Sequence, residues 1–344
     1  MSTAATEPPR KGFFGRAALI VLAIVLAYAN SFSGPFIIDD HLSIVENRQI
    51  RSLRNIGAVL SAERESPTAG RPLVNLSFAV NHALGGLDVR GYHIVNVGIH
   101  ALCALLIFLI VRLTLELPRM RGALRRVAPD IGFAAALLWA VHPLNTEAVN
   151  YLTQRTELLM ALFYLLTLYG SIRASQSESS RSGWKWSVAA VSSCVAGMAC
   201  KESMATAPVM VVLYDAIFVF GSVGRAWAGR WRLYLSMAAS WILLAILISS
   251  GPRIHSAGFG VDVTPWTYLL NQAAMICRYI ELAIWPQRLV INYGWPSAVT
   301  LADVWPYALV VLVLLGATAL ALVRRPLLGF LGAWFFITLA ASKN

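Results

Sequence analysis

The sequence predicts an all-α polytopic membrane protein, and three observations support this class. First, its 344 residues are 58% hydrophobic and only 13% charged, about half the charged fraction of a soluble domain. Second, long apolar stretches recur along the chain, and helices satisfy their own backbone inside a bilayer. Third, the excess of basic residues, a formal net charge of +11, falls in alternate loops, as the positive-inside rule requires. This charge therefore indicates membrane orientation and not binding to nucleic acid.

About nine of the apolar stretches are predicted to cross the membrane. In order, they are residues 17–32, 94–115, 131–149, 158–172, 186–199, 204–221, 233–250, 304–323 and 327–341. Several are shorter than the roughly 20 residues that a spanning helix needs, so polar residues must complete their ends. A further stretch, 266–285, carries Asn271, Gln272, Arg278 and Glu281. These polar residues favour a re-entrant or interfacial helix on the outer side.

The chain is expected to divide into three parts. Residues 1–16 form a cytoplasmic amino terminus, and residues 17–250 form a transmembrane module that includes an external loop, 33–92. Residues 251–344 supply a second external loop, the interfacial segment and the last spans. Within the loop 33–92, residues 55–60 and 73–84 have helical apolar spacing, which predicts short helices at the membrane surface. The absence of an internal repeat argues against transporters built from duplicated halves.

Ionisable and strongly polar residues gather at the external ends of the predicted spans. They are Asp39, Asp40, Arg71, His93, Asn96, His100, His142, Glu147, Arg155, Glu157, Lys201, Glu202, Arg278 and Glu281. Such groups are costly in or beside a membrane and usually face a functional cavity. As a set of acids and bases, they predict a site for an anionic headgroup beside a general base.

Structural roles remain open for each member of this set. Asp39 and Asp40 could begin a solvated loop, and a buried hydrogen bond could satisfy His100. Arg155 and Lys201 could anchor helices at the membrane interface. The four cysteines have no metal-ligand spacing and are expected to be small buried apolar residues.

The polar residues also form an ordered series of motifs. The series is Asp39-Asp40 with Ile44 and Asn47, Arg71-Pro72-Leu73, Gly91-Tyr92-His93 with Asn96 and His100, His142-Pro143 with Thr146-Glu147, Arg155 with Leu158-Leu159, and Lys201-Glu202. Over residues 36–214 it resembles the TMTC-type protein O-mannosyltransferases, which belong to the GT-C superfamily of polyprenyl-phosphate-sugar glycosyltransferases. The tetratricopeptide repeats of the eukaryotic members are not in this sequence, which favours a bacterial inner membrane over the endoplasmic reticulum.

The resemblance implies a GT-C-type helix bundle that transfers a sugar, with mannose favoured, from a polyprenyl-phosphate donor. The implied acceptor is a hydroxyl of a protein, with a serine or threonine favoured, or of a glycan. Transfer would occur at the periplasmic or lumenal face and would invert the anomeric carbon. A flippase or transporter of a lipid-linked or anionic substrate is the alternative, because it also needs an anion site.

The resemblance also implies roles for the individual residues. Asp39 would be the general base, and Asp40 would orient the acceptor or hold a divalent metal ion. The candidates for binding the donor phosphate are Arg71, His93, His100, Arg155, Lys201 and Arg278. The candidates for supporting roles are Asn96, His142, Glu147 and Glu202.

Overall fold

The computed structural model describes residues 10–250, 265–290 and 300–341. Within these ranges the regular structure is entirely helical, which confirms the all-α prediction for the described part of the chain. The start of the predicted cytoplasmic terminus and the first part of the predicted second external loop lie outside the described residues.

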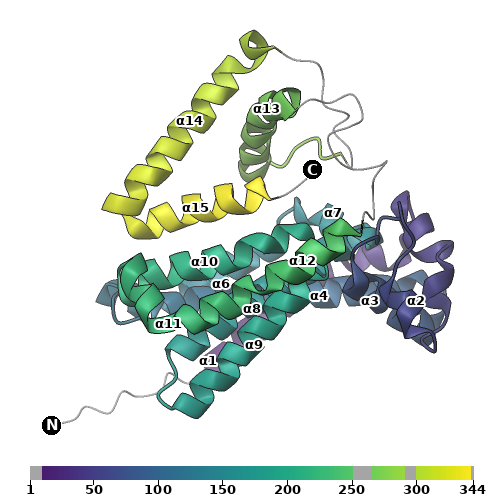
Figure 1. The fold of residues 1–344 in the computed structure, drawn as a ribbon, viewed down its shortest axis with the longest axis horizontal. Helices are drawn as coiled ribbons and strands as arrows, with labels where there is room; N and C mark the ends of the chain where they lie inside the picture. The colour runs from purple at the N-terminus through teal and green to yellow at the C-terminus, as the bar shows by residue number, and fades with distance from the viewer. Residues whose placement is uncertain (1–9, 251–264, 291–299, 342–344) are drawn as a thin grey trace.

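Eight of the described helices form the main body of the molecule (Figure 1). They are α1 (Arg10–Ala27), α4 (Val89–Leu115), α6 (Ala128–Ala140), α8 (Arg155–Ser175), α9 (Ser180–Met198), α10 (Ala207–Tyr214), α11 (Val223–Ala238) and α12 (Ser240–Ser249). Helix α8 packs against both α4 and α9, and α4 also packs against α6. Helices α13 (Pro265–Ile284), α14 (Leu301–Arg324) and α15 (Pro326–Ala340) pack in sequence, with α14 against both others, and lie beside this body.

Five helical segments in the described residues are long and apolar enough to cross a membrane. They are Val89–Leu115, Leu152–Ser175, Glu202–Phe220, Val223–Ser249 and Leu301–Arg324. Shorter apolar helices cover Gly12–Ala27, Ala128–Ala140 and Pro326–Ala340. These segments support an integral membrane protein, while the predicted count of nine spans stays a prediction.

The two surface helices predicted in the external loop are present. Helix α2 (Ile56–Leu60) begins where the Asn55 side chain accepts a hydrogen bond from the Ala58 amide. Helix α3 (Pro72–Gly85) has proline in its first turn, where no intrahelical N–H bond is lost. Both helices lie at one end of the main body (Figure 1).

Several predicted spans differ from the observed helices, and two of them have a clear local reason. The predicted span 131–149 is divided into α6 and the short helix α7 (Asn145–Asn150), because Pro143 disfavours helical geometry at the preceding residue. The predicted span 233–250 belongs to a longer segment that starts at Val223. Inside that segment, Arg230 leaves helical geometry with φ −141° and donates a 2.6 Å hydrogen bond to the buried Asp215.

A hydrophobic cluster joins the external loop to the bundle. Val74 and Phe78 of α3 pack with Tyr92 of α4 and with Leu152, which precedes α8. All four side chains are almost fully buried. Burial of this kind contributes about 1.5–3 kcal/mol for a large side chain, so the loop is fixed against the spans.

The close contact between α4 and α6 gives a test of the bundle. A Cβ atom at Gly132 of α6 would lie 2.9 Å from the backbone oxygen of Phe108 in α4. We expect Gly132→Ala to lower the free energy of unfolding by about 1–3 kcal/mol. The control is Gly98→Ala in α4, where the added methyl group meets open space and the higher helix propensity of alanine raises stability by up to about 1 kcal/mol. Thermal melts in detergent measure the stability of both variants. Equal changes in the two would contradict the close contact between α4 and α6.

Candidate functional site

Several of the predicted polar residues converge where the segment after α1 meets the start of α8. Two acids, Asp39 and Asp40, follow α1 and its short extension, the 3-10 turn η1 (Ala29–Ser33). Opposite them lie Tyr151 and the 3-10 turn η4 (Leu152–Gln154), which leads directly into Arg155. The spans therefore carry the loop that holds this candidate site.

Asp40 is fully buried and its carboxylate is held by three hydrogen bonds. Its Oδ1 accepts 2.7 Å bonds from both the backbone nitrogen and the hydroxyl of Thr153. Its Oδ2 accepts a 3.1 Å bond from the backbone nitrogen of Ile37. Burial raises the pKa of Asp40, and the hydrogen bonds oppose this rise. Asp40 thus anchors the loop after α1 to the start of α8, and its predicted role in orienting the acceptor or holding a divalent metal ion stays a prediction.

Asp39 has different surroundings although it is the adjacent residue. It is half-buried, and its backbone nitrogen donates a 3.1 Å bond to the Tyr151 hydroxyl oxygen. The Tyr151 phenol also interacts with the Asp39 carboxylate, and burial together with this nearby negative charge raises the pKa of Tyr151. A protonated phenol therefore stands beside a carboxylate that remains partly open to its surroundings.

The backbone between Phe36 and Asp40 explains how adjacent acids separate. Ile38 adopts a φ of 43°, in the left-handed region that β-branched residues rarely occupy. Such a conformation costs on the order of 1–3 kcal/mol and persists only where surrounding contacts enforce it. The bond from Ile37 to Asp40 spans this residue, so the bend is part of the anchor.

Arg155 is a buried hub with neutral partners. Its guanidinium donates 2.7 Å bonds to the side-chain oxygens of Asn96 and Asn81 and a 2.9 Å bond to the Tyr92 carbonyl. It also lies 4.6 Å from the ring centroid of Phe78. These contacts join α3, α4 and α8, and they favour a structural role. The predicted contact between Arg155 and a donor phosphate stays a prediction.

The three polar residues on α4 also point to local partners. His93 Nε2 lies 3.2 Å from the Gly34 carbonyl, and His100 Nε2 lies 2.8 Å from the Ala140 carbonyl. His100 stacks on Trp139 with ring centroids 4.7 Å apart. Asn96 donates a 3.2 Å bond to the Val149 carbonyl. Both histidines therefore link α4 to neighbouring segments, and their predicted phosphate contacts stay predictions.

A second group of charges lies at the same end of the bundle. Lys201 forms an ion pair with Glu157, and Arg71 forms one with Glu202 at 3.5 Å. Burial and the nearby Glu157 raise the pKa of Glu147, and Lys201 opposes this rise. Arg71 and Lys201 are thus predicted phosphate ligands that take part in carboxylate pairs at this end of the bundle, and an anionic headgroup could rearrange these pairs.

Two of the predicted site residues, Arg278 and His142, make their contacts at helix α13 and not at the acid pair. Arg278 bonds to Glu281 at 2.7 Å within its own helix α13, and His142 lies 3.1 Å from the Ala283 carbonyl at the end of α13. Neither shares a hydrogen bond or ion pair with the acid pair in the described residues. The described part of the chain also contains no group of three or more His, Cys, Asp or Glu residues placed to hold a metal ion.

Sequence reasoning did not identify Tyr151, Thr153 or Asn81. Tyr151 and Thr153 lie between the predicted Glu147 and Arg155, so proximity to those motifs was the available signal. The signal for Asn81 was weaker, since Asn81 is one of a few polar residues in a largely apolar surface helix.

This chain is similar to several larger proteins. It is 28% identical to the Drosophila melanogaster protein O-mannosyl-transferase Tmtc1 over 86% of this chain and 36% of that protein. It is 30% identical to human TMTC4 over 57% of this chain and 28% of that protein, and 28% identical to mouse TMTC3 over 69% and 26%. The match thus spans between about a quarter and about a third of the length of these relatives. No protein-family model and no solved structure matches this chain.

The anchor of Asp40 predicts the effect of a matched pair of variants. Thr153→Val removes the hydroxyl donor to the buried carboxylate, and we expect the free energy of unfolding to fall by about 1–3 kcal/mol. Thr156→Val is the control, because its buried hydroxyl has no hydrogen-bond partner and its loss costs little. Thermal unfolding of both variants in the same detergent tests this. An equal loss in the two would show that the Thr153–Asp40 bond is not the anchor.

Proposed function

We propose that this chain, a homologue of the TMTC protein O-mannosyl-transferases, is a membrane glycosyltransferase that uses a polyprenyl-phosphate-sugar donor. Mannose is the favoured sugar, and a serine or threonine hydroxyl of a protein is the favoured acceptor. The proposal extends to a periplasmic or lumenal active site, with a bacterial inner membrane favoured. The names of the relatives, protein O-mannosyl-transferases, support sugar transfer to protein.

The different surroundings of the two acids carry this proposal. The Asp40 carboxylate is buried and accepts three hydrogen bonds. Asp39 is half-buried, and its backbone nitrogen donates a hydrogen bond to the Tyr151 hydroxyl oxygen. A general base must be accessible to its substrate and held in position. Asp39 meets both requirements, and Asp40 supplies the rigidity.

In the proposed reaction Asp39 accepts the proton of the acceptor hydroxyl. The hydroxyl oxygen forms a bond to the anomeric carbon while the bond from that carbon to the phosphate oxygen breaks. The polyprenyl phosphate leaves with the electron pair, so one displacement inverts the anomeric configuration. Lys201 and Arg71 are the proposed partners of the charge that develops on the phosphate, because both lie at this end of the bundle.

The proposed sidedness predicts a labelling pattern. In a Cys277→Ser background, cysteines at Arg90 and Leu144 should react with a membrane-impermeant maleimide in sealed vesicles that expose the non-cytoplasmic face. Cysteines at Arg121 and Arg181 should react only after permeabilisation, because these basic loops are predicted to be cytoplasmic. All four positions are exposed, so differences in burial do not explain the pattern. Labelling of Arg121→Cys in sealed vesicles would refute the proposed orientation.

The proposed base predicts a separation between turnover and binding. Asp39→Asn keeps the shape of the side chain but removes its basicity, so turnover should fall at least about a hundredfold. Donor affinity should stay within a few fold, because Asp39 acts on the acceptor in the transition state. Glu63→Gln is the charge-matched control on an exposed part of the same loop. Transfer from radiolabelled polyprenyl-phosphate-mannose measures turnover, and near-normal transfer by Asp39→Asn would remove it as the base.

A further inference from the structure

Exposed arginines gather at the end of the bundle opposite the acid pair. They lie on the connection from α4 to α6, which contains the short helix α5 (Gly122–Arg126), and on helix α11. Figure 1 shows α11 at the end of the main body away from α2 and α3. These arginines, which we call the basic surface, are Arg119, Arg121, Arg125, Arg126, Arg225 and Arg232.

The two segments that carry the basic surface lie against each other. Gly221, just before α11, has a positive φ of 79°, and a Cβ atom at this position would collide with the Arg119 guanidinium. Arg119 therefore packs directly on the turn that leads into α11. The arginines of the connection and those of α11 are thus brought together by the fold.

The basic surface has no acidic partner among the described residues. Residues 117–129 and 221–238 contain no aspartate or glutamate. Acids that flank these ranges or pair within α11 already have arginine partners: the ion pairs are Arg112–Glu116, Arg16–Asp130 and Arg230–Asp215. No ion pair of the described chain includes an arginine of the basic surface. Its positive charge is therefore available to an external anion.

Helix α11 places the basic surface at the membrane boundary. It opens the apolar segment Val223–Ser249, whose 27 residues extend about 40 Å as a helix, longer than the roughly 30 Å hydrocarbon core. The segment bends at Arg230, so the residues before it can lie along the membrane surface. Val223, Trp227 and Trp231 are 45–59% exposed and recur every four positions. Exposed tryptophans at the end of a span are typical of the headgroup region.

Arginine and tryptophan are also neighbours on this surface. The Arg232 guanidinium lies 5.4 Å from the ring centroid of Trp231, within the range of a cation–π contact. A guanidinium binds phosphate oxygens through its fork of N–H donors, and a tryptophan ring packs against the ends of lipid chains. A lipid with an anionic headgroup satisfies both side chains at once.

We propose that the basic surface binds the phosphate groups of anionic phospholipids in the adjoining leaflet, with Trp227 and Trp231 against the lipid chains. That leaflet is predicted to be the cytoplasmic one. The positive charge complements the headgroup, and the exposed apolar side chains favour a lipid over a soluble polyanion, which would leave them in water. The inference goes beyond sugar transfer and does not depend on it.

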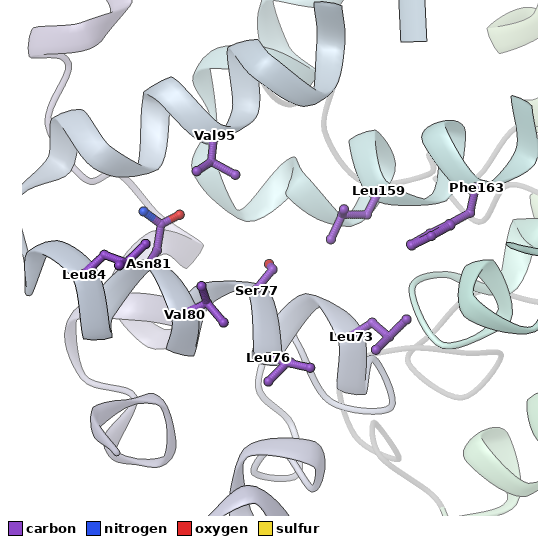
Figure 2. A pocket seen from close by; sticks show the side chains of 9 residues that line it. All are labelled: Leu73, Leu76, Ser77, Val80, Asn81, Leu84, Val95, Leu159 and Phe163. Atoms are coloured by element: carbon purple, nitrogen blue, oxygen red, sulfur yellow. The ribbon is translucent and has the colours of Figure 1, made fainter. Parts of the chain in front are cut away.

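A lipid-accessible surface at the other end of the bundle provides a comparison. An apolar groove of about 340 Å³ lies between α3, α4 and α8, and no charged residue lines it. Figure 2 shows Val80 and Leu84 on its α3 side, with Leu159 and Phe163 on its α8 side. Leu84 is 83% exposed. This end offers apolar contact without a charge that would select a headgroup.

A fluorophore at either end can report the local lipid composition. In the Cys277→Ser background, Gly224→Cys lies beside the basic surface, where a Cβ atom meets open space, and Leu84→Cys lies at the groove. Full-length protein is reconstituted in phosphatidylcholine vesicles with nitroxide-labelled phosphatidylglycerol or phosphatidylcholine of the same chain length as quencher. We expect phosphatidylglycerol to be preferred at least about fivefold at position 224, the effect of roughly one arginine beside an anionic leaflet. The preference should shrink with added salt and stay below about twofold at position 84.

Variants at three arginines test the cause of this preference. Glutamine at Arg125, Arg126 and Arg225 together should lower the preference at position 224 below about twofold. Lysine at the same positions keeps the charge and should hold the preference within about twofold of wild type. The matched control replaces three exposed arginines of the external loop by glutamine and should change nothing; they are Arg48, Arg54 and Arg64. Thermal melts establish that each variant is folded.

Each part of the proposal can be overturned separately. Absence of quenching at position 224 by either lipid would overturn the placement of α11 at the membrane, and equal quenching by the two lipids would overturn the headgroup preference. A preference that survives the three glutamines, or that the three lysines abolish, would overturn the role of arginine charge. If a single-stranded RNA oligonucleotide removes the preference while quenching by phosphatidylcholine persists, the surface favours a soluble polyanion and the lipid assignment fails.

Discussion

The buried guanidinium of Arg155 is the interaction on which this end of the molecule depends. Helix α8 begins at this residue, and its partners come from α3 and α4. A charge in a low-dielectric interior is tolerated only when its donors are satisfied. The three helices must therefore keep their relative positions, and this fixes the positions of the segments attached to them.

The acid pair, Asp39 and Asp40, is positioned in this way. Thr153 lies just before Arg155 and fixes Asp40, which fixes the loop after α1. The left-handed Ile38 then lets the next carboxylate face a different environment. The two adjacent acids thus have different roles. Asp40 is enclosed and fixes the loop, and Asp39 remains accessible on a rigid backbone. This arrangement is a physical basis for the activity proposed from the relatives.

Local signals predicted much of the fold, and long-range contacts decided the rest. The external-loop helices were predictable because apolar spacing, Asn55 and Pro72 act within a few residues. The end of α6 was missed because apolar composition outweighed Pro143. The sequence also placed the polar residues at one end of the bundle. The local sequence could not show that Asp40 is enclosed while Asp39 stays partly exposed, because the enclosing contact comes from Thr153, 113 positions from Asp40. It also could not assign Arg155 to neutral partners on α3 and α4.

The order of the partners of Arg155 along the chain has a consequence for biogenesis. Its acceptors lie on Asn81, Tyr92 and Asn96, all of which are synthesised before α8 emerges from the ribosome. Synthesis runs from the amino terminus, so α3 and α4 leave the ribosome before this arginine does. The oxygens that accept from the guanidinium are therefore in the chain before the charge that needs them.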